Sequence, residues 1–449
     1  MNKILDYEQV LDELNKITSF NVIKEEEDLA TTEYGLPIKY YTCGSGNLDI
    51  VITGATHGQE IITTDFVINL MKDISINLDK WQSVLKEFKI HFIPMLNPEG
   101  YLITTSAIRK KIPRNMRDEE SQKICGEYYK IFKQDALDKE NKGLKRHQLF
   151  FEGVDYTCID DKYSKLKEHI KRIFEKYPDL PKWCLHTWSS NGNGIDIQAN
   201  SKFNPAINRI YNNENVFMNS NSLNNIDISH PGPINCPFDK EKGFAEEKET
   251  KAISDLLERL DKENRLFVYL NYHSAGSMIF QRPANVPEGL SVFEDLSKKE
   301  MINYMFAKLY SSRTYKNNGV DENGNDRKNQ TRYRIIKSKY NATSTNDIFR
   351  LLYNQDILIE LSALGGNPLS AYYNIDNLYN NLIESNLEAV RHSLSICSIS
   401  KMLSEYLYYK MNELGESFDY ESATEVLDLI YQEFDSKVVK LEKDRKYLL

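Results

Sequence analysis

A histidine and a glutamate lie three residues apart, shortly after a β-branched apolar run of this sequence. The run is Val51-Ile-Thr-Gly54, and the pair is His57 and Glu60. An imidazole nitrogen and a carboxylate oxygen together suit zinc, which takes three protein ligands in catalytic sites and keeps a fourth position for water. Such a pair is also common on protein surfaces, so a metal site needs further donors from elsewhere in the chain.

Two more polar residues stand at the ends of apolar runs and supply those donors. His273 follows the run 266–270, and Glu360 closes the run that starts at Asp356. Ligands of open α/β sheets bind beyond the carboxyl ends of the strands, so these groups are expected at one edge of a sheet. A buried strand tolerates a carboxylate only if that carboxylate has a partner or a task. We therefore expect three of the four groups to hold zinc and the fourth to take a proton from an activated water.

Helices and strands are expected to alternate around these residues. Apolar spacing predicts helices over 4–18, 61–72, 162–176 and about 244–262, strands over 36–42, 48–53, 89–96 and 266–270, and a turn over 97–100. This alternation predicts an α/β fold with a mixed, mostly parallel central sheet flanked by helices.

The domain organisation is expected to be one catalytic domain with helical additions. The predicted parts are an N-terminal helical segment (1–30), a catalytic domain (31–395) that carries a helical insertion at about 117–182, and a C-terminal helical extension (396–449). An Asn-, Asp- and Lys-rich stretch, 316–332, reads as an exposed loop.

Composition limits the class of protein. The chain has 449 residues and a net charge of -9, which disfavours a nucleic-acid binder because no basic surplus neutralises phosphates. No apolar stretch reaches the roughly 20 residues of a membrane span, and the N-terminus lacks the apolar core of a signal peptide. The six cysteines are widely spaced and contain no CxxC, which indicates free thiols. We expect a cytoplasmic protein without a membrane partner; the oligomeric state is not indicated.

Taken in order along the chain, the four chemical residues resemble the motifs of the zinc carboxypeptidase (metallocarboxypeptidase) family over about residues 30–395. That family has an HxxE pair, a distant histidine at a strand end and a glutamate in a short apolar strand. The resemblance implies a peptide substrate and one zinc ion held by His57, Glu60 and His273. It implies that Glu360 is the general base and later returns the proton to the leaving amine.

Further segments extend the resemblance to substrate-binding residues. Asn97-Pro-Glu-Gly-Tyr101 resembles the NPDGY turn of the family, and Gly194-Ile-Asp-Ile-Gln-Ala-Asn200 resembles its GVDLNRN segment. The resemblance gives Arg114 a place beside the oxyanion and makes Arg109 and Tyr340 substrate-binding candidates.

One departure concerns the substrate. The family grips a terminal carboxylate with an Asn-Arg pair, whereas the matching positions here are Gln198 and Ala199. Losing the arginine removes a charge-assisted contact, and Arg282, nine residues after His273, is a candidate replacement.

The departure favours bacterial members that cut the γ-D-glutamyl–diaminopimelate bond of peptidoglycan peptides, and hence a murein-peptide or isopeptide hydrolase. Two alternatives stay open: an N-acyl amino-acid deacylase or other amidase of the same fold, and a non-catalytic zinc- or peptide-binding protein.

Overall fold

The structure is a computed structural model of the whole chain. It describes residues 5–112, 119–121, 123–124, 126–127, 151–176, 178, 182–198, 200, 238–239, 243–244, 246–274, 276–281, 306–307, 309–314, 333–337, 356–361 and 380–399.

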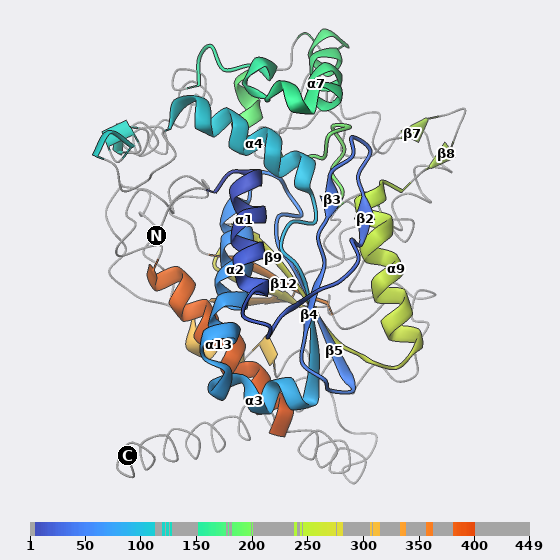
Figure 1. Cartoon of the computed structure of the whole chain (residues 1–449), viewed down its shortest axis with the longest axis vertical. Helices are drawn as coiled ribbons and strands as arrows, with labels where there is room; N and C mark the ends of the chain where they lie inside the picture. Colours follow the sequence, from blue (N-terminus) through green and yellow to red (C-terminus); the bar gives the residue numbers. More distant parts are fainter. Residues whose placement is uncertain are drawn as a thin grey trace.

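A mixed sheet forms the centre of the described part (Figure 1). Its eight strands, in spatial order, are β1 (Lys24–Glu25), β4 (Tyr41–Cys43), β6 (Phe88–Ile93), β5 (Leu48–Thr53), β9 (Leu266–Ser274), β12 (Asp356–Leu361), β10 (Met278–Gln281) and β11 (Arg334–Lys337). The neighbours β6, β5, β9 and β12 run parallel, whereas β4 and β10 pair with this parallel core antiparallel. Two smaller sheets pair β2 (Ala30–Thr31) with β3 (Pro37–Ile38) and β7 (Phe238–Asp239) with β8 (Gly243–Phe244).

Helices cover both faces of the central sheet. The helices are α1 (Tyr7–Thr18), α2 (Ile61–Ile76), α3 (Leu78–Glu87), α4 (Pro98–Lys111), α7 (Ser164–Lys176), α9 (Lys248–Lys262) and α13 (Asn380–Ile399), with short 3₁₀ turns at Tyr156–Cys158, Asp161–Tyr163 and Lys182–Thr187. Figure 1 shows α1, α2, α3 and α13 on one side and α9 on the other, with α4 and α7 beyond one end of the sheet. The predicted fold class is therefore confirmed.

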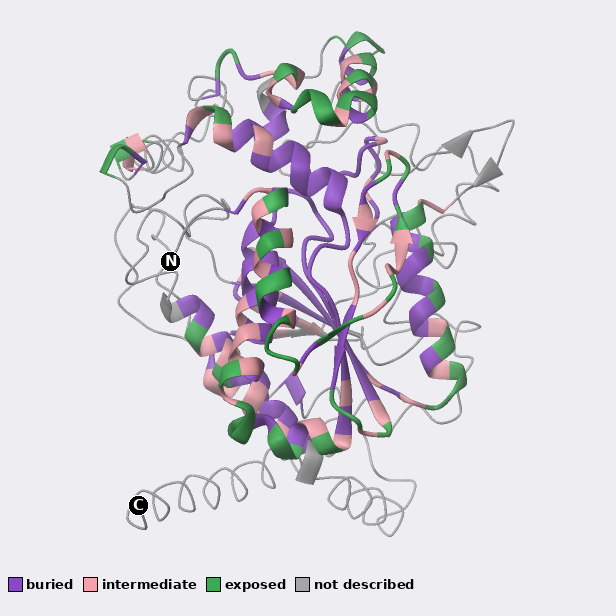
Figure 2. Ribbon diagram, in the orientation of Figure 1, coloured by how far each residue is buried: buried purple, intermediate pink, exposed green. Residues whose placement is uncertain are grey.

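The alternation of side chains along the central strands separates two apolar cores. In β9, Val268, Leu270 and Tyr272 join the core beneath α2, while Tyr269 joins the core beneath α9. Leu266 also joins the core beneath α9, because the register with β5 shifts between Leu266 and Val268. Helix α2 is buried on nearly every side because it packs between α1, α3, α13 and the sheet, as its buried ribbon in Figure 2 shows. The described residues include no helix long and apolar enough to cross a membrane.

Most predicted elements are present, with local corrections. The predicted strand 36–42 is wrong as one element, because β3 and β4 belong to different sheets. The predicted strand 89–96 ends at Ile93, since Pro94 has no N–H for the ladder. The first helix starts at Tyr7 rather than residue 4, because Asp6 and Gln9 form a capping box there.

The predicted turn at 97–100 is the beginning of a helix. Asn97 is the N-cap of α4, and its Oδ1 accepts a hydrogen bond from the Gly100 N–H at 2.8 Å. Pro98 occupies the first helical position, where its missing N–H costs nothing.

The predicted domain boundaries remain predictions. Two features bear on how they would be drawn: α1 contributes to the core beneath α2, and α13 runs through the boundary at 395/396. The predicted loop 316–332 and residues 400–449 lie outside the described residues.

Candidate metal centre

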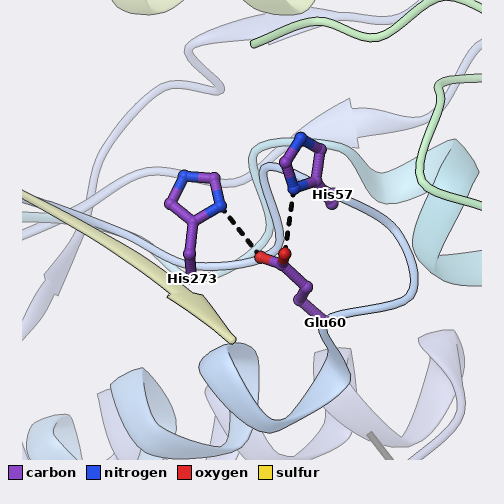
Figure 3. A group of neighbouring side chains, drawn as sticks. All are labelled: His57, Glu60 and His273. Carbon is purple, nitrogen blue, oxygen red and sulfur yellow. Dashed lines mark hydrogen bonds and ion pairs between the residues drawn. The ribbon is translucent and has the colours of Figure 1, made fainter. Parts of the chain in front are cut away.

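His57, Glu60 and His273 meet at one point in the structure (Figure 3). The Glu60 carboxylate lies between the two rings: Oε1 is 2.9 Å from Nδ1 of His57, and Oε2 is 3.0 Å from Nδ1 of His273. One ligand atom from each residue lies within 4.8 Å of the others, and all three residues are buried. The three sequence-predicted ligands, which are separated by up to 216 residues, are thus brought together.

The loop between β5 and α2 carries the first two of these residues. Ala55 turns the chain with a φ of 45°, a left-handed conformation that non-glycine residues rarely adopt. Gly58 lies so close to α4 that a Cβ there would meet the carbonyl carbon of Gly100 at 2.2 Å. Glu60 is the N-cap of α2 but makes no side-chain capping bond, because its carboxylate faces the histidines. The loop conformation therefore directs the Glu60 carboxylate to the histidines and not to the N-terminus of α2.

The charges of the centre support one another. Burial would raise the pKa of Glu60, but His273 and His57 outweigh burial and lower the pKa to about 2. Burial would lower the pKa of His57, but Glu60 and Asp196 outweigh it and raise the pKa well above the usual value. The chain thus presents a carboxylate with imidazole nitrogens on both sides.

Asp196 is a residue of the centre that the sequence did not single out. Its Oδ1 lies 3.3 Å from Nε2 of His57, on the opposite side of the ring from Glu60. A carboxylate in this position fixes the tautomer and orientation of a metal-binding histidine. The sequence signal for Asp196 is its place in the segment 194–200, which resembles the GVDLNRN segment of the family.

This donor set fits a zinc ion. Two imidazole nitrogens and one carboxylate are the ligand types that zinc takes in catalytic sites. Within the described part of the chain, the buried Nε2 of His273 has no hydrogen-bond partner, so the ring depends on its Nδ1 side for contacts. The contact between His57 and Asp196 provides the second carboxylate that metal-binding histidines usually have.

Glu360 lies on the strand beside His273. The parallel register of β12 and β9 pairs Glu360 with His273, and the antiparallel register with β10 pairs it with Met278. Ile359 and Leu361 face the core beneath α2, so alternation puts Glu360 on the other face of the sheet, with His273. Glu360 is partly exposed, in contrast to the three buried ligand candidates.

The predicted substrate-binding residues are only partly described. Gln198 is buried next to the centre, and its Oε1 accepts a hydrogen bond from Asn271 at 3.3 Å. The guanidinium of Arg109 reaches α1 instead, with Nη2 3.2 Å from Gln9 and Nε 3.8 Å from Asp6. Arg114, Ala199, Arg282 and Tyr340 lie outside the described residues.

Comparison with known protein families finds a similarity over one part of the chain. Residues 11–157, about a third of the 449-residue chain, match the family model described as zinc carboxypeptidase. This chain is a zinc carboxypeptidase-like hydrolase. The matched segment contains His57 and Glu60 but neither His273 nor Glu360. Zinc carboxypeptidases use zinc, and the donors just described are where this zinc carboxypeptidase-like chain could hold it.

Solved structures give distant likenesses to this zinc carboxypeptidase-like chain. Bovine thrombin-activatable fibrinolysis inhibitor, solved with tick carboxypeptidase inhibitor, is 14% identical, with coverage of 89% of this chain and 98% of that one and a TM-score of 0.49. Carboxypeptidase A from Helicoverpa armigera is 15% identical, with coverage of 88% and 73% and a TM-score of 0.49. A metallo-carboxypeptidase from Burkholderia cenocepacia is 9% identical, with coverage of 88% and 69% and a TM-score of 0.42. No curated protein sequence matches the chain.

Proposed function

We propose that the chain hydrolyses a peptide or isopeptide bond at a single zinc ion held by His57, Glu60 and His273. The observation that carries the proposal is the convergence of these three buried donors, with the Glu60 carboxylate 2.9 and 3.0 Å from the two imidazole nitrogens. A zinc ion held there would polarise the scissile carbonyl and activate water. The rest of the chemistry falls to side chains of this chain.

Glu360 is the proposed general base. It is partly exposed and stands beside His273 in the sheet, so it can meet both solvent and a substrate that approaches the centre. A carboxylate in this place takes a proton from the attacking water and passes it to the leaving amine. Arg114 is the proposed donor to the oxyanion.

The proposed substrate is a peptide or isopeptide whose recognition does not depend on an arginine at position 199. Gln198 offers an amide at this place, and the next residue is Ala199. Arg109, Arg282 and Tyr340 remain proposed substrate contacts. A peptidoglycan-derived γ-D-glutamyl–diaminopimelate peptide is the specific substrate we propose, since its recognition differs from that of an ordinary C-terminal residue.

The test is hydrolysis of a defined panel by the purified, zinc-loaded protein. The panel contains γ-D-glutamyl–diaminopimelate peptides, ordinary C-terminal dipeptides and N-acyl amino acids. We expect cleavage of the isopeptides, and a loss of rate of about 10²–10⁴-fold in Glu360→Gln without loss of zinc.

A matched control is Glu384→Gln, which removes an exposed carboxylate from α13 and should leave the rate unchanged. Cleavage of C-terminal dipeptides alone would overturn the proposed substrate but not the hydrolase. Full activity of Glu360→Gln would overturn the role of Glu360 as the base.

A further inference from the structure

A chain of buried hydrogen bonds centres on Asn271, two residues before His273. Its Oδ1 accepts hydrogen bonds from the hydroxyls of Thr53 at 3.1 Å and Thr56 at 3.0 Å. Its Nδ2 donates to Oε1 of Gln198 at 3.3 Å. All four side chains are buried, with exposed fractions of 0 to 2%. A single amide therefore joins three parts of the sequence: its own strand, residues 53–56 and Gln198.

The sheet places Asn271 where it can make these contacts. Thr53 and Asn271 are register partners on the parallel strands β5 and β9, so their side chains lie on the same face. Tyr269 and His273 are two residues away from Asn271 on β9 and share that face. This row of polar side chains leads along β9 directly to the metal centre.

The numbers of donors and acceptors fix the direction of each hydrogen bond in this network. The Thr53 hydroxyl has one hydrogen and gives it to Asn271, so the Tyr269 hydroxyl, 3.0 Å away, must donate to Thr53. With two hydroxyl donors on its oxygen, Asn271 turns its NH₂ group to Gln198. This in turn makes Oε1 the end of the Gln198 amide that faces β9.

Each contacted segment also carries a group of the metal centre. Thr56 immediately precedes His57, and Gln198 lies two residues after Asp196, whose carboxylate contacts His57. Asn271 itself is on the strand of His273. Loss of the Asn271 amide would therefore release the Thr56 hydroxyl beside His57 and the Gln198 side chain near Asp196.

We propose that Asn271 is a positioning residue that holds the His57 loop against the His273 strand and sets the amide orientation of Gln198. It touches no substrate and no metal in this role, and it acts through Thr56 and through its own strand. This inference rests on the proposed metal centre at His57, Glu60 and His273.

The test is the zinc affinity of metal-free protein, measured by competition with a chromophoric chelator. Thr56→Val keeps the shape of the side chain and removes its hydrogen-bond donor. Asn271→Ala removes the amide that makes all three hydrogen bonds. We expect both variants to bind zinc about 10–100-fold more weakly, the range seen when groups that orient metal ligands are removed.

Thr105→Val is the matched control. Thr105 is equally buried, and its hydroxyl donates to the carbonyl of Tyr101 at 2.8 Å within α4, away from the three segments. It should lower the thermal midpoint of the metal-free protein much as Thr56→Val does and leave zinc affinity unchanged. A role of Thr56 in stability alone would make the two variants equal in both measurements.

Unchanged zinc affinity in folded Thr56→Val would overturn the inference, even if Asn271→Ala failed to fold. Failure of the proposed centre itself would look different: wild type would bind no zinc, or His273→Ala would bind it as tightly as wild type.

Discussion

At the scale of single residues, the centre depends on side chains that hold the ligands as well as on the ligands. Asp196 shows this, because its Oδ1 contacts Nε2 of His57 and also accepts a hydrogen bond from the Gln198 N–H at 2.9 Å. The backbone of its own loop thus holds the Asp196 carboxylate in the position from which it contacts the His57 ring. The HxxE pair and the strand ends indicate the ligands, whereas only the folded structure shows that the Asp196 carboxylate reaches the ring of His57.

We predict that Asp196→Ala weakens zinc binding about 10–100-fold, because His57 loses the partner that orients its ring. Asp160→Ala is the control: Asp160 accepts the same kind of bond, from the Lys162 N–H at 2.9 Å, in an exposed 3₁₀ turn. Chelator competition on both variants measures the effect. Equal zinc affinities would contradict the role of Asp196.

At the scale of elements, the centre exists because the loop 54–60 fits between β5, α2 and the start of α4. The Asn97 amide holds this junction, since its Nδ2 donates to the carbonyls of Ser190 at 3.1 Å and Thr56 at 3.3 Å. Gly58 allows the close approach of the loop to Gly100. The conformation of the loop therefore depends on its contacts with α4 and with Ser190 as well as on the residues of the HxxE motif.

We predict that Gly58→Ala lowers the free energy of unfolding by about 1–3 kcal/mol and also weakens zinc binding at least tenfold, because the added Cβ pushes the loop away from Gly100. The control is Gly35→Ala. Gly35 has a φ of 89° and no neighbouring atom within 4 Å of a Cβ, so its cost of about 1–2 kcal/mol comes from the backbone alone.

Chemical unfolding and zinc titration of the two variants separate these effects. The stability losses should be similar, whereas only Gly58→Ala should lose zinc affinity. A Gly58→Ala protein that binds zinc like wild type would show that the loop tolerates the displacement.

The sequence predicts an element well where the apolar pattern within that element is enough to distinguish a helix from a strand. The β-branched run 48–53 and the apolar spacing of α1 are two cases. The start of α4 was missed because Asn-Pro-Glu-Gly is compatible with both a turn and a capped helix start, and the contacts of Asn97 with residues 189–190 decide between them. Arg109 was expected near substrate, yet its contacts with α1 come from tertiary packing that spacing does not reveal.

At the scale of the whole molecule, a buried acidic cluster affects stability. Glu249 on α9 is almost fully buried, and its Oε2 accepts a hydrogen bond from Asn191 at 3.4 Å. Burial, and then the nearby charge of Glu99, raise the pKa of Glu249 to about 8. Burial likewise raises the pKa of Glu99. Glu247 also faces the cluster, through Asn191 at 2.8 Å.

We predict that the free energy of unfolding falls as pH rises from about 4.5 to about 8. In this window folded Glu249 keeps a proton that the unfolded chain has lost, so each pH unit costs up to about 1.4 kcal/mol. Glu249→Gln removes this dependence, so its stability relative to wild type should improve by about 2–4 kcal/mol between pH 5 and pH 8.

Urea unfolding across this pH range measures the difference, with Glu263→Gln, an exposed glutamate just after α9, as the control. Glu99 leaves a smaller slope of the same sign in Glu249→Gln. Parallel stability curves for wild type and Glu249→Gln would contradict a protonated Glu249.

The measurement that tests the metal centre most directly is a zinc titration of the metal-free protein, followed by both bound zinc and the thermal midpoint. A ligand that binds only the folded state raises the midpoint as its concentration exceeds its dissociation constant. We predict one zinc per chain, a higher midpoint for wild type, and neither effect for His273→Ala at the same zinc concentration. Wild type without bound zinc, or His273→Ala with wild-type affinity, would contradict a centre formed by His57, Glu60 and His273.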